Sequence, residues 1–295
     1  MEIRQLEAFI AVVREGSFTR AAHRLNLAQP SLSARIRKLE RSLGGPLFKR
    51  DSRPVKLTML GETFLDFAER AVGILDAGRE AVRSAKLGLA GRVTVCCPYS
   101  LATSLMHQVV DRFGQTYTQS ELYIEAGHSD FAASQLMDGL VNLAFAAAFP
   151  RILMQTQTLL RLHDEMVVAV TPGHPLAAAA EPAVTDLWQY RLLIIHWGAA
   201  FSAYVESLRQ ESHSAGVTIR VPLAAALPMA RQPDTVTFLP RRLAAVAGLV
   251  ALDMPEFRFD WDMVLITRPG RSLTALEQGF VDIVETVWKE GQPIQ

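Results

Sequence analysis

The residues with the clearest chemical potential lie on one face of a predicted helix from Gln29 to Leu43. Its buried stripe recurs at helical spacing and consists of Leu32, Ile36, Leu39 and Leu43. The opposite face carries short hydroxyls and long cations, namely Ser31, Ser33, Arg35, Arg37, Lys38 and Arg41, with Ala34 among them. A glutamine amide can make two hydrogen bonds to adenine, and a serine hydroxyl adapts to several base edges. Gln29, Ser31 and Ser33 therefore predict base contacts in a DNA major groove, and the cations predict contacts to bases or phosphates.

An ordinary solvated helix face is the simplest alternative, because exposed charge is the default of soluble helices. The preceding segments favour the DNA interpretation. Residues 3–14 predict an amphipathic helix that ends at Gly16, and Ser17 can cap a second helix that runs to about Leu25. Two consecutive alanines at 21–22 allow a close helix crossing, and residues 26–28 form a short break. This arrangement is typical of a helix-turn-helix.

The segment after the third helix predicts a small β-hairpin with a cationic tip. Gly44-Gly45-Pro46 ends the helix, and a basic turn at residues 49–54 separates two short apolar stretches. We expect this hairpin to be a wing whose cations contact phosphates or the minor groove, through Arg50, Arg53 and Lys56.

A long helix is predicted from Thr58 as its cap to about Leu87. Its apolar positions alternate three and four residues apart, at Leu60, Phe64, Phe67, Ala71, Ile74, Gly78, Ala81 and Ala85. So long and exposed a helix predicts pairing with its copy in a second subunit. Residues 88–91 are expected to form a hinge after it.

The charge distribution separates the two ends of the chain, although the net charge is zero. Residues 1–60 hold 12 Lys and Arg against 5 Asp and Glu, a net +7, and the remainder carries −7. Only the basic part can neutralise phosphates. The N-terminus lacks the pattern of a signal peptide, and no stretch is apolar enough for a membrane span, so we expect a cytoplasmic protein without membrane contact.

Beyond the hinge, strands alternate with amphipathic helices, which predicts an α/β fold with a mostly parallel sheet. The expected strands are Arg92–Cys97, Glu121–Ala126, Leu140–Ala148, Glu165–Val170, Arg191–His196, Thr235–Leu239 and Met263–Thr267. Ligands in such folds bind beyond the carboxyl ends of strands. The candidates for binding a small effector are therefore Ser100, His128, Ser129, His196, Trp197 and Phe201. The alternative roles are helix capping for the serines, a core position for His196, and packing for the two large aromatics.

Other chemistries find little support in the sequence. Cys96 and Cys97 are neighbours, so in a strand they point to opposite faces, and buried small apolar residues are favoured over a redox pair. The sequence contains no P-loop, no nucleophile elbow, no dinucleotide fingerprint and no zinc-ligand spacing. We therefore expect no catalytic residue, metal or cofactor, and we predict that the protein is not an enzyme.

The run from Leu6 to Gly61 resembles the DNA-binding region of LysR-type transcription regulators. The matching residues are Leu6, Phe9, Gly16-Ser17-Phe18-Thr19, Ala21-Ala22, Leu25, Gln29-Pro30-Ser31-Leu32-Ser33, Ile36, Leu39-Glu40, Leu43-Gly44, Pro46-Leu47-Phe48, Arg50, Leu57-Thr58 and Gly61. The resemblance adds Thr19 and Pro30 to the expected DNA contacts. At position 34 this chain has Ala, where many relatives carry a long polar or basic residue.

The remainder resembles the family's effector domain, through Gly91–Val95, Leu136–Phe145 and Gly173-His174-Pro175-Leu176. The resemblance implies a winged helix-turn-helix at 1–58, a linker helix for dimerisation at 59–90 and a two-lobed, periplasmic-binding-protein-like α/β domain at 91–295. Lobe I would comprise about 91–160 and 267–295, and lobe II about 161–266.

The implied function is a sequence-specific transcription regulator that responds to a small effector, a carboxylate or an aromatic metabolite. The implied partners are duplex DNA, a homodimer that assembles further into a tetramer, and RNA polymerase. The alternatives are a solute-binding protein or an enzyme that carries a DNA-binding or interaction head.

Overall fold

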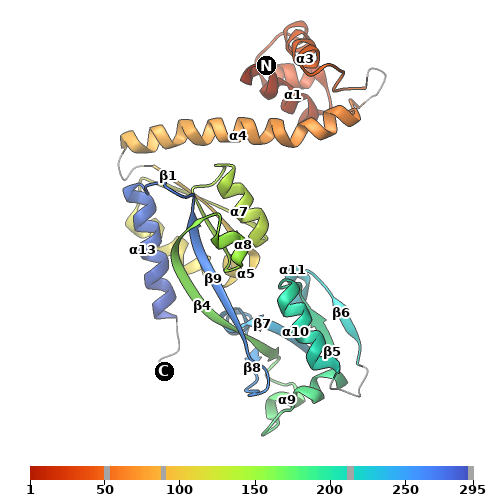
Figure 1. The fold of residues 1–295 in the computed structure, drawn as a ribbon, viewed down its shortest axis with the longest axis vertical. Helices are drawn as coiled ribbons and strands as arrows, with labels where there is room; N and C mark the ends of the chain where they lie inside the picture. Colours follow the sequence, from red (N-terminus) through yellow and green to blue (C-terminus); the bar gives the residue numbers. More distant parts are fainter. Residues whose placement is uncertain (50–53, 88–90, 211–215, 292–295) are drawn as a thin grey trace. The chain divides into compact units, whose positions relative to one another are not determined.

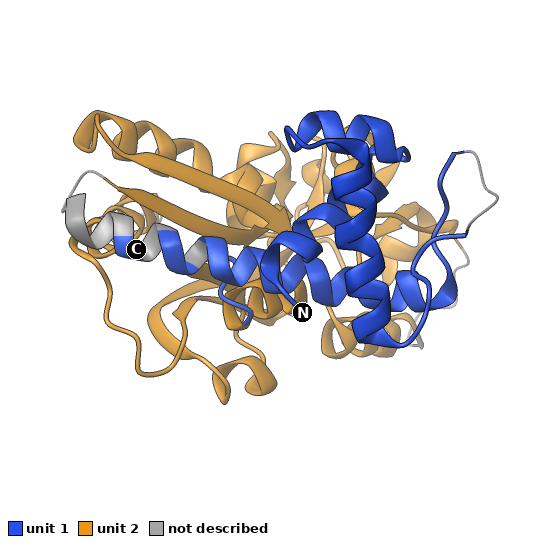
Figure 2. Cartoon of the chain, turned by 90° about the horizontal axis from the view of Figure 1, so that it is seen from above, with its two compact units in different colours: residues 1–83, 138–140 blue, residues 84–137, 141–295 orange. Residues whose placement is uncertain are grey.

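A computed structural model describes residues 1–49, 54–87, 91–210 and 216–291 of the chain. The side chains at 77, 80, 81, 83–87 and 210 also lie outside the description. The chain divides into two compact units, which Figure 2 colours separately: residues 1–83 with 138–140, and residues 84–137 with 141–295.

The head is built from three short helices whose ends the sequence specifies locally. They are α1 (Ile3–Glu15), α2 (Phe18–Arg24) and α3 (Gln29–Leu43). Gly16 ends α1 with a left-handed φ of 59°, and the Ser17 side chain accepts a hydrogen bond from the Arg20 amide at the start of α2. Gly44 ends α3 in the same left-handed way, with φ 80°. The predicted helix-turn-helix is therefore confirmed, with its helix boundaries.

The base of the predicted wing closes this head. Phe48 and Leu57 form an antiparallel bridge, and the Lys49 amide donates to the Lys56 carbonyl over 2.9 Å. Phe48 packs against Phe9 of α1 with ring centroids 5.4 Å apart, which joins the hairpin to the helical core. The tip, with Arg50 and Arg53, lies outside the described residues.

Helix α4 (Met59–Leu87) follows directly, as Figure 1 shows. The Thr58 hydroxyl accepts a hydrogen bond from the Gly61 amide, which confirms the predicted cap. The apolar positions predicted along α4 have two different roles. Phe64 and Ala71 pack on the core of the head, whereas Phe67 and Ile74 are 63% and 46% exposed. Some of these positions therefore belong to the head itself. The side chains of the last two, Ala81 and Ala85, lie outside the description.

The second unit is built on one sheet, and within the described residues its strands follow the order β2-β1-β3-β9-β4-β7-β5-β6, with β8 beside β4. The strands are β1 (Arg92–Pro98), β2 (Glu121–Gly127), β3 (Leu143–Ala147), β4 (Gln157–Val170), β5 (Arg191–Ile194), β6 (Thr218–Arg220), β7 (Thr235–Pro240), β8 (Val250–Ala251) and β9 (Phe259–Thr267). Three parallel strands, β2-β1-β3, form one end, and β7-β5-β6 form the other. The α/β expectation is confirmed, but the expectation of a mostly parallel sheet is wrong. Four of the eight pairings among the described strands are antiparallel, because β4 and β9 run between the two parallel ends.

Helices cover the sheet at both ends. They are α5 (Tyr99–Ser104), α6 (Met106–Thr116), α7 (Ser129–Met137), α8 (Pro150–Leu153), α9 (Pro175–Ala178), the 3₁₀ helix η1 (Val184–Gln189), α10 (Ala199–Gln210), α11 (Leu223–Met229), α12 (Arg241–Val246) and α13 (Ala275–Glu290). Cys96 and Cys97 belong to different hydrophobic clusters on opposite faces of β1, as the alternation of a strand predicts.

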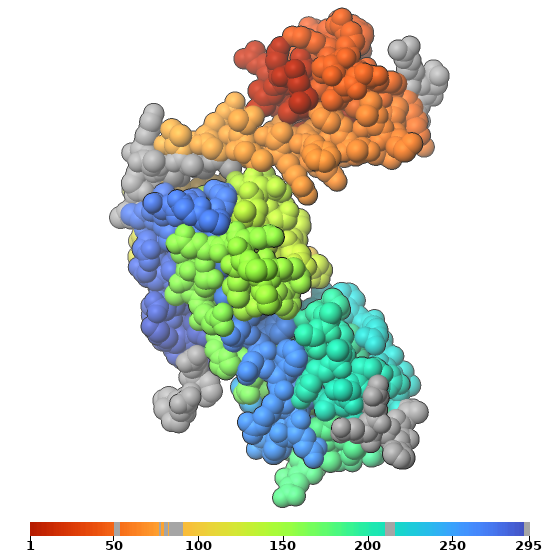
Figure 3. Space-filling model, in the orientation of Figure 1, coloured from red at the N-terminus to blue at the C-terminus, as the bar shows by residue number. Residues whose placement is uncertain are grey.

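Two long antiparallel strands, β4 and β9, join the two ends of this sheet. They pair from Gln157 opposite Thr267 to Met166 opposite Phe259, and both are longer than the sequence predicted. Figure 3 shows the domain as two masses, with the segments of β4 and β9 reaching into both. The carboxyl ends of β1, β2 and β3 on one lobe and of β5 on the other are therefore held by a common pair of strands.

Candidate nucleic-acid interface and effector site

The beginning of α3 lies on the surface of the head. Ala28 precedes the helix without a side-chain cap, and Pro30 occupies the first turn, where no amide donor is needed. The exposed residues of this region are Gln29, Pro30, Ser31, Ala34, Arg37 and Lys38, whereas Ser33 and Arg35 are half-buried. The sequence-based expectation of an outward helix start is thus confirmed.

Two contacts organise the polar side chains of α3. The Gln29 amide nitrogen donates to the Ser33 hydroxyl over 3.2 Å, one turn further along the helix. The Lys38 ammonium bonds a carboxylate oxygen of Glu2 at 2.6 Å, and this hydrogen bond holds the pKa of Glu2 below its usual range. Both partners of that ion pair are exposed, so a phosphate can replace the carboxylate at little cost.

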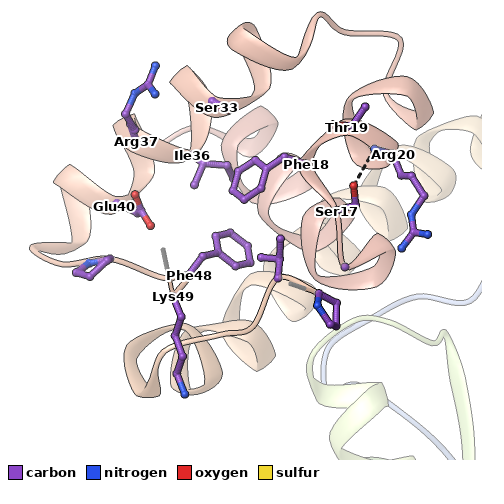
Figure 4. A pocket seen from close by; sticks show the side chains of 14 residues that line it. Ser17, Phe18, Thr19, Arg20, Ser33, Ile36, Arg37, Glu40, Phe48 and Lys49 are labelled. Carbon is purple, nitrogen blue, oxygen red and sulfur yellow. Dashed lines mark hydrogen bonds between the residues drawn. The ribbon is translucent and has the colours of Figure 1, made fainter. Parts of the chain in front are cut away.

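An open hollow lies between α2, α3 and the base of the wing (Figure 4). Its volume of about 1430 Å³ exceeds the roughly 300–1,000 Å³ of small-molecule pockets. Arg20, Arg37 and Lys49 line it, and Figure 4 shows their charged ends extending away from the two rings at its centre. Thr19 lies exposed among the same lining residues. Such a cationic concavity fits a polyanion better than a metabolite.

Sequence reasoning missed two of these cations. Arg20 directly follows the helix start that Ser17 caps, and Lys49 directly precedes the wing turn, so their positions in the motif were the available signal. The rings of Phe18 and Phe48 pack edge to face, 5.4 Å apart. Both belong to the core of the head or pack against it, so their rings serve packing within the head.

On the first lobe, the structure brings two predicted loops together. Strands β1 and β2 are parallel with Pro98 opposite Gly127, so the residues that follow lie side by side. His128 is exposed, and its ring meets Tyr99 edge to face at 5.9 Å. Ser100 is 5% exposed in the first turn of α5. The Ser129 hydroxyl accepts a hydrogen bond from the Ala147 amide over 2.9 Å.

The loop after β5 approaches the first lobe through aromatic rings. Trp197 donates its indole hydrogen to the Phe238 carbonyl over 2.9 Å and packs 5.5 Å from Trp261. Trp261 also meets Phe149, which follows β3, at 6.4 Å. Gly198 has a left-handed φ of 104°, and a Cβ there would lie 3.2 Å from the Phe149 ring. Phe149 and Trp261 were missed by sequence reasoning, because only the fold places them beside this loop.

The two remaining candidates have contrasting positions. His196 is exposed at the end of β5, so the core alternative does not apply to it. Phe201 is 1% exposed and is enclosed by the rings of Phe238, Phe257 and Phe259. Its ring therefore anchors α10 on the second lobe instead of offering a surface to a ligand.

The polar triplet at 163–165 lies on the strand pair that joins the lobes. His163 bonds Asp262 of β9 at 2.7 Å, and this hydrogen bond raises the pKa of the imidazole. Asp164 accepts a hydrogen bond from the Arg242 amide at the start of α12. The Arg242 guanidinium lies 4.2 Å from the centre of the Trp288 ring and donates to the Trp288 carbonyl over 2.8 Å. These contacts give the triplet a structural role, because they connect β4 to β9, α12 and α13.

The cysteines offer no reactive thiol. Burial raises the pKa of Cys96 and of Cys97 to about 12. Both side chains are fully buried and free. Because the thiolate is the reactive form, neither residue is primed for redox chemistry at neutral pH.

Comparison with known families identifies both parts of the chain. Residues 3–62 match the model of the bacterial regulatory helix-turn-helix protein of the lysR family, and residues 86–289 match the LysR substrate binding domain. The chain belongs to the LysR family. It is accordingly a DNA-binding transcription regulator with a two-lobed effector-binding domain, and LysR regulators form oligomers.

Individual relatives agree with this assignment. The regulator BudR of Raoultella terrigena is 32% identical over 192 residues, which cover 63% of this chain and 65% of BudR. A probable RuBisCO transcriptional regulator of Phaeodactylum tricornutum is 27% identical over 208 residues, 70% of this chain and 68% of that regulator. These LysR relatives are regulators, so the solute-binding and enzymatic alternatives lose their basis.

A solved structure supports the fold over the whole length. The full-length LysR regulator CbnR in complex with its target DNA superposes with a TM-score of 0.74 at 22% identity, covering 97% of this chain and 100% of CbnR. None of the described helices is long and apolar enough to cross a bilayer.

Proposed function

We propose that this LysR regulator reads a two-fold-related promoter site by placing the start of α3 in the major groove. The exposed, uncapped start of α3, flanked by cations, is the observation that carries the proposal. Gln29, Ser31 and Ser33 contact base edges, and Thr19, Pro30 and Arg35 border them. Arg37, Lys38, Lys56, Arg50 and Arg53 contact phosphates or the minor groove, together with Arg20 and Lys49.

Oligomerisation through α4 completes this reader. The exposed apolar residues Leu60, Phe67, Ile74, Leu75 and Val82 give the helix a surface that a second copy can cover. A homodimer then presents two copies of α3 about one turn of DNA apart, roughly 34 Å. We propose that two dimers form a tetramer and that the promoter-bound assembly meets RNA polymerase. The domains are 1–58, 59–90 and 91–295, with the lobe boundary inside β4 and β9.

The effector site lies where the strand ends of the two lobes meet. His128 and His196 are exposed there, and the Ser100 and Ser129 hydroxyls stand at the starts of α5 and α7. Trp197, with Phe149, offers an apolar wall. Imidazole and hydroxyl groups beside aromatic rings suit a small carboxylate or an aromatic metabolite. A thermal-shift screen of small carboxylates with and without an aromatic ring tests this, because a bound effector stabilises the folded domain.

The DNA-reading roles are tested by selecting duplexes from a random library with the full-length protein. Gln29→Ala should relax the selected sequence by about 1–3 kcal/mol of discrimination, because the lost amide is the group proposed to bond a base edge. Lys56→Ala should weaken binding to all sequences alike and reduce the salt slope by about 0.9, as the loss of one phosphate contact predicts. Arg112→Ala, which removes a cation of α6 paired with Glu290, is the control and should change neither. Equal effects of all three substitutions would contradict the roles assigned to α3 and the wing.

A further inference from the structure

The outermost side chain near the start of α3 is a methyl group. A helix turns about 100° per residue, and Leu32, Ile36 and Leu39 point into the core of the head. Ala34 lies roughly 170° from their mean direction, further outward than any other residue between Gln29 and Lys38. It is exposed, so nothing in the head covers it.

Ala34 has an apolar neighbour towards the start of the helix, whereas polar side chains flank it on both sides and exposed cations follow one turn later. Pro30 lies one turn before it and is also exposed, so the two form a continuous apolar strip. Gln29 and Ser33 bond each other beside this strip. Residues 28–34 include no charged side chain, and the first cation of the helix is the half-buried Arg35. The side chains near the start of α3 that project furthest from the head are therefore small and uncharged.

The floor of the major groove contains one apolar group, the 5-methyl of thymine, whereas guanine is typically read by Arg or Lys. We propose that Pro30 and Ala34 read thymine methyl groups, so that the base pairs at the centre of each half-site are A·T. This inference rests on the proposed placement of α3 in the major groove. The small side chains of the strip also let the helix backbone approach the groove closely.

The Gln29–Ser33 hydrogen bond is consistent with the same base pairs. The Gln29 amide nitrogen has two hydrogens, and one of them is directed to Ser33. The second hydrogen and the carbonyl oxygen remain for N7 and N6 of an adenine. In such an A·T pair, the adenine bonds the Gln29 amide, and the methyl group of the thymine contacts the strip formed by Pro30 and Ala34.

The proposal is tested with deoxyuridine, which lacks only the 5-methyl group. A duplex selected by the full-length protein is resynthesised with each thymine of the half-site replaced in turn, and affinity is measured at constant salt. Loss of one contacted methyl should weaken binding about fourfold, from the value of one buried methyl-sized group. We expect this at one or two positions of each half-site, and no change at the others.

Substitutions assign the contact to Ala34. In Ala34→Gly, binding should weaken and replacement of the contacted thymine should have no further effect, because the methyl has lost its partner. Ser42→Gly, at an exposed position near the end of the same helix, is the control for a glycine in α3. In this variant, replacing the contacted thymine by deoxyuridine should still weaken binding about fourfold. Ala34→Arg should shift the selected base at that position toward guanine.

The outcomes separate the two proposals. Uracil tolerated at every thymine, or selected half-sites without thymine, would overturn methyl reading, and the role of α3 would stand if Gln29→Ala still relaxed the sequence. Unchanged selection by Ala34→Arg and by Gln29→Ala together would overturn the placement of α3 itself.

Discussion

Replacing Gly61 by alanine should destabilise the head, although alanine is the better helix former. Gly61 lies in the first turn of α4, and a Cβ there would overlap the Leu47 carbonyl oxygen and lie 2.8 Å from a methyl of Leu57. The same carbonyl accepts the Thr58 amide hydrogen over 2.9 Å, so it cannot move aside without losing that bond. Overpacking costs about 1–3 kcal/mol and the hydrogen bond about 1 kcal/mol. The better helix propensity of alanine offsets about 1 kcal/mol of this cost, so the net loss is about 1–3 kcal/mol.

The distribution of aromatic residues makes this loss measurable in isolation. All four tryptophans lie beyond residue 187, so tryptophan fluorescence follows the effector domain alone, whereas far-ultraviolet circular dichroism follows both parts. We expect Gly61→Ala to lower the first melting step seen by circular dichroism by about 5–20 °C, with the fluorescence transition unchanged. Gly78→Ala is the matched control on α4, because no heavy atom lies within 4 Å of its added Cβ. A head that melts in Gly61→Ala at or above the wild-type temperature would refute the packing argument.

Three further outcomes concern the effector domain. The hydrogen bond to Asp262 raises the pKa of His163 above its unfolded value, so its stabilising contribution is present below about pH 6.5 and is lost as pH rises through the folded pKa. His163→Gln should therefore flatten the fall of unfolding free energy above about pH 6.5, and an identical pH profile would contradict this coupling. Cys96 and Cys97 should resist a thiol reagent at pH 8 in the native protein and react only in denaturant. Arg242→Ala should lower the free energy of unfolding by about 1–2 kcal/mol, measured from the urea midpoint, because the indole at the end of α13 loses the guanidinium stacked on it. Arg242→Lys should lower it less.

The head could be predicted almost completely, because its signals are local. Gly16, Ser17 and Gly44 each determine the conformation of their own few residues, and the apolar spacing identifies the buried face of each helix. The sequence could not show that Phe64 packs on the core of the head, because a heptad pattern does not reveal which neighbour covers each position.

The sequence predicted seven of the nine described strands, all except the short β6 and β8, and it predicted their lengths less well. The expected strand Glu165–Val170 is only the second half of β4. The first half consists mostly of exposed and half-buried residues, and its extended conformation depends on pairing with β9. The three-residue β6 was missed because so short a strand has no period of its own. In the candidate effector site, strand ends predicted Trp197, whereas Trp261 enters it from a distant strand.

The pairing of β4 with β9 has a consequence for how this regulator can be altered. The chain enters the second lobe along β4 and returns along β9, and Met166 of β4 lies opposite Phe259 of β9. Everything between them is an insertion with adjacent points of attachment, a geometry that tolerates replacement of whole segments. A foreign lobe grafted at these two points would inherit the existing connection to the first lobe, so the part of the effector site that the second lobe contributes could be exchanged without redesigning the DNA-binding head.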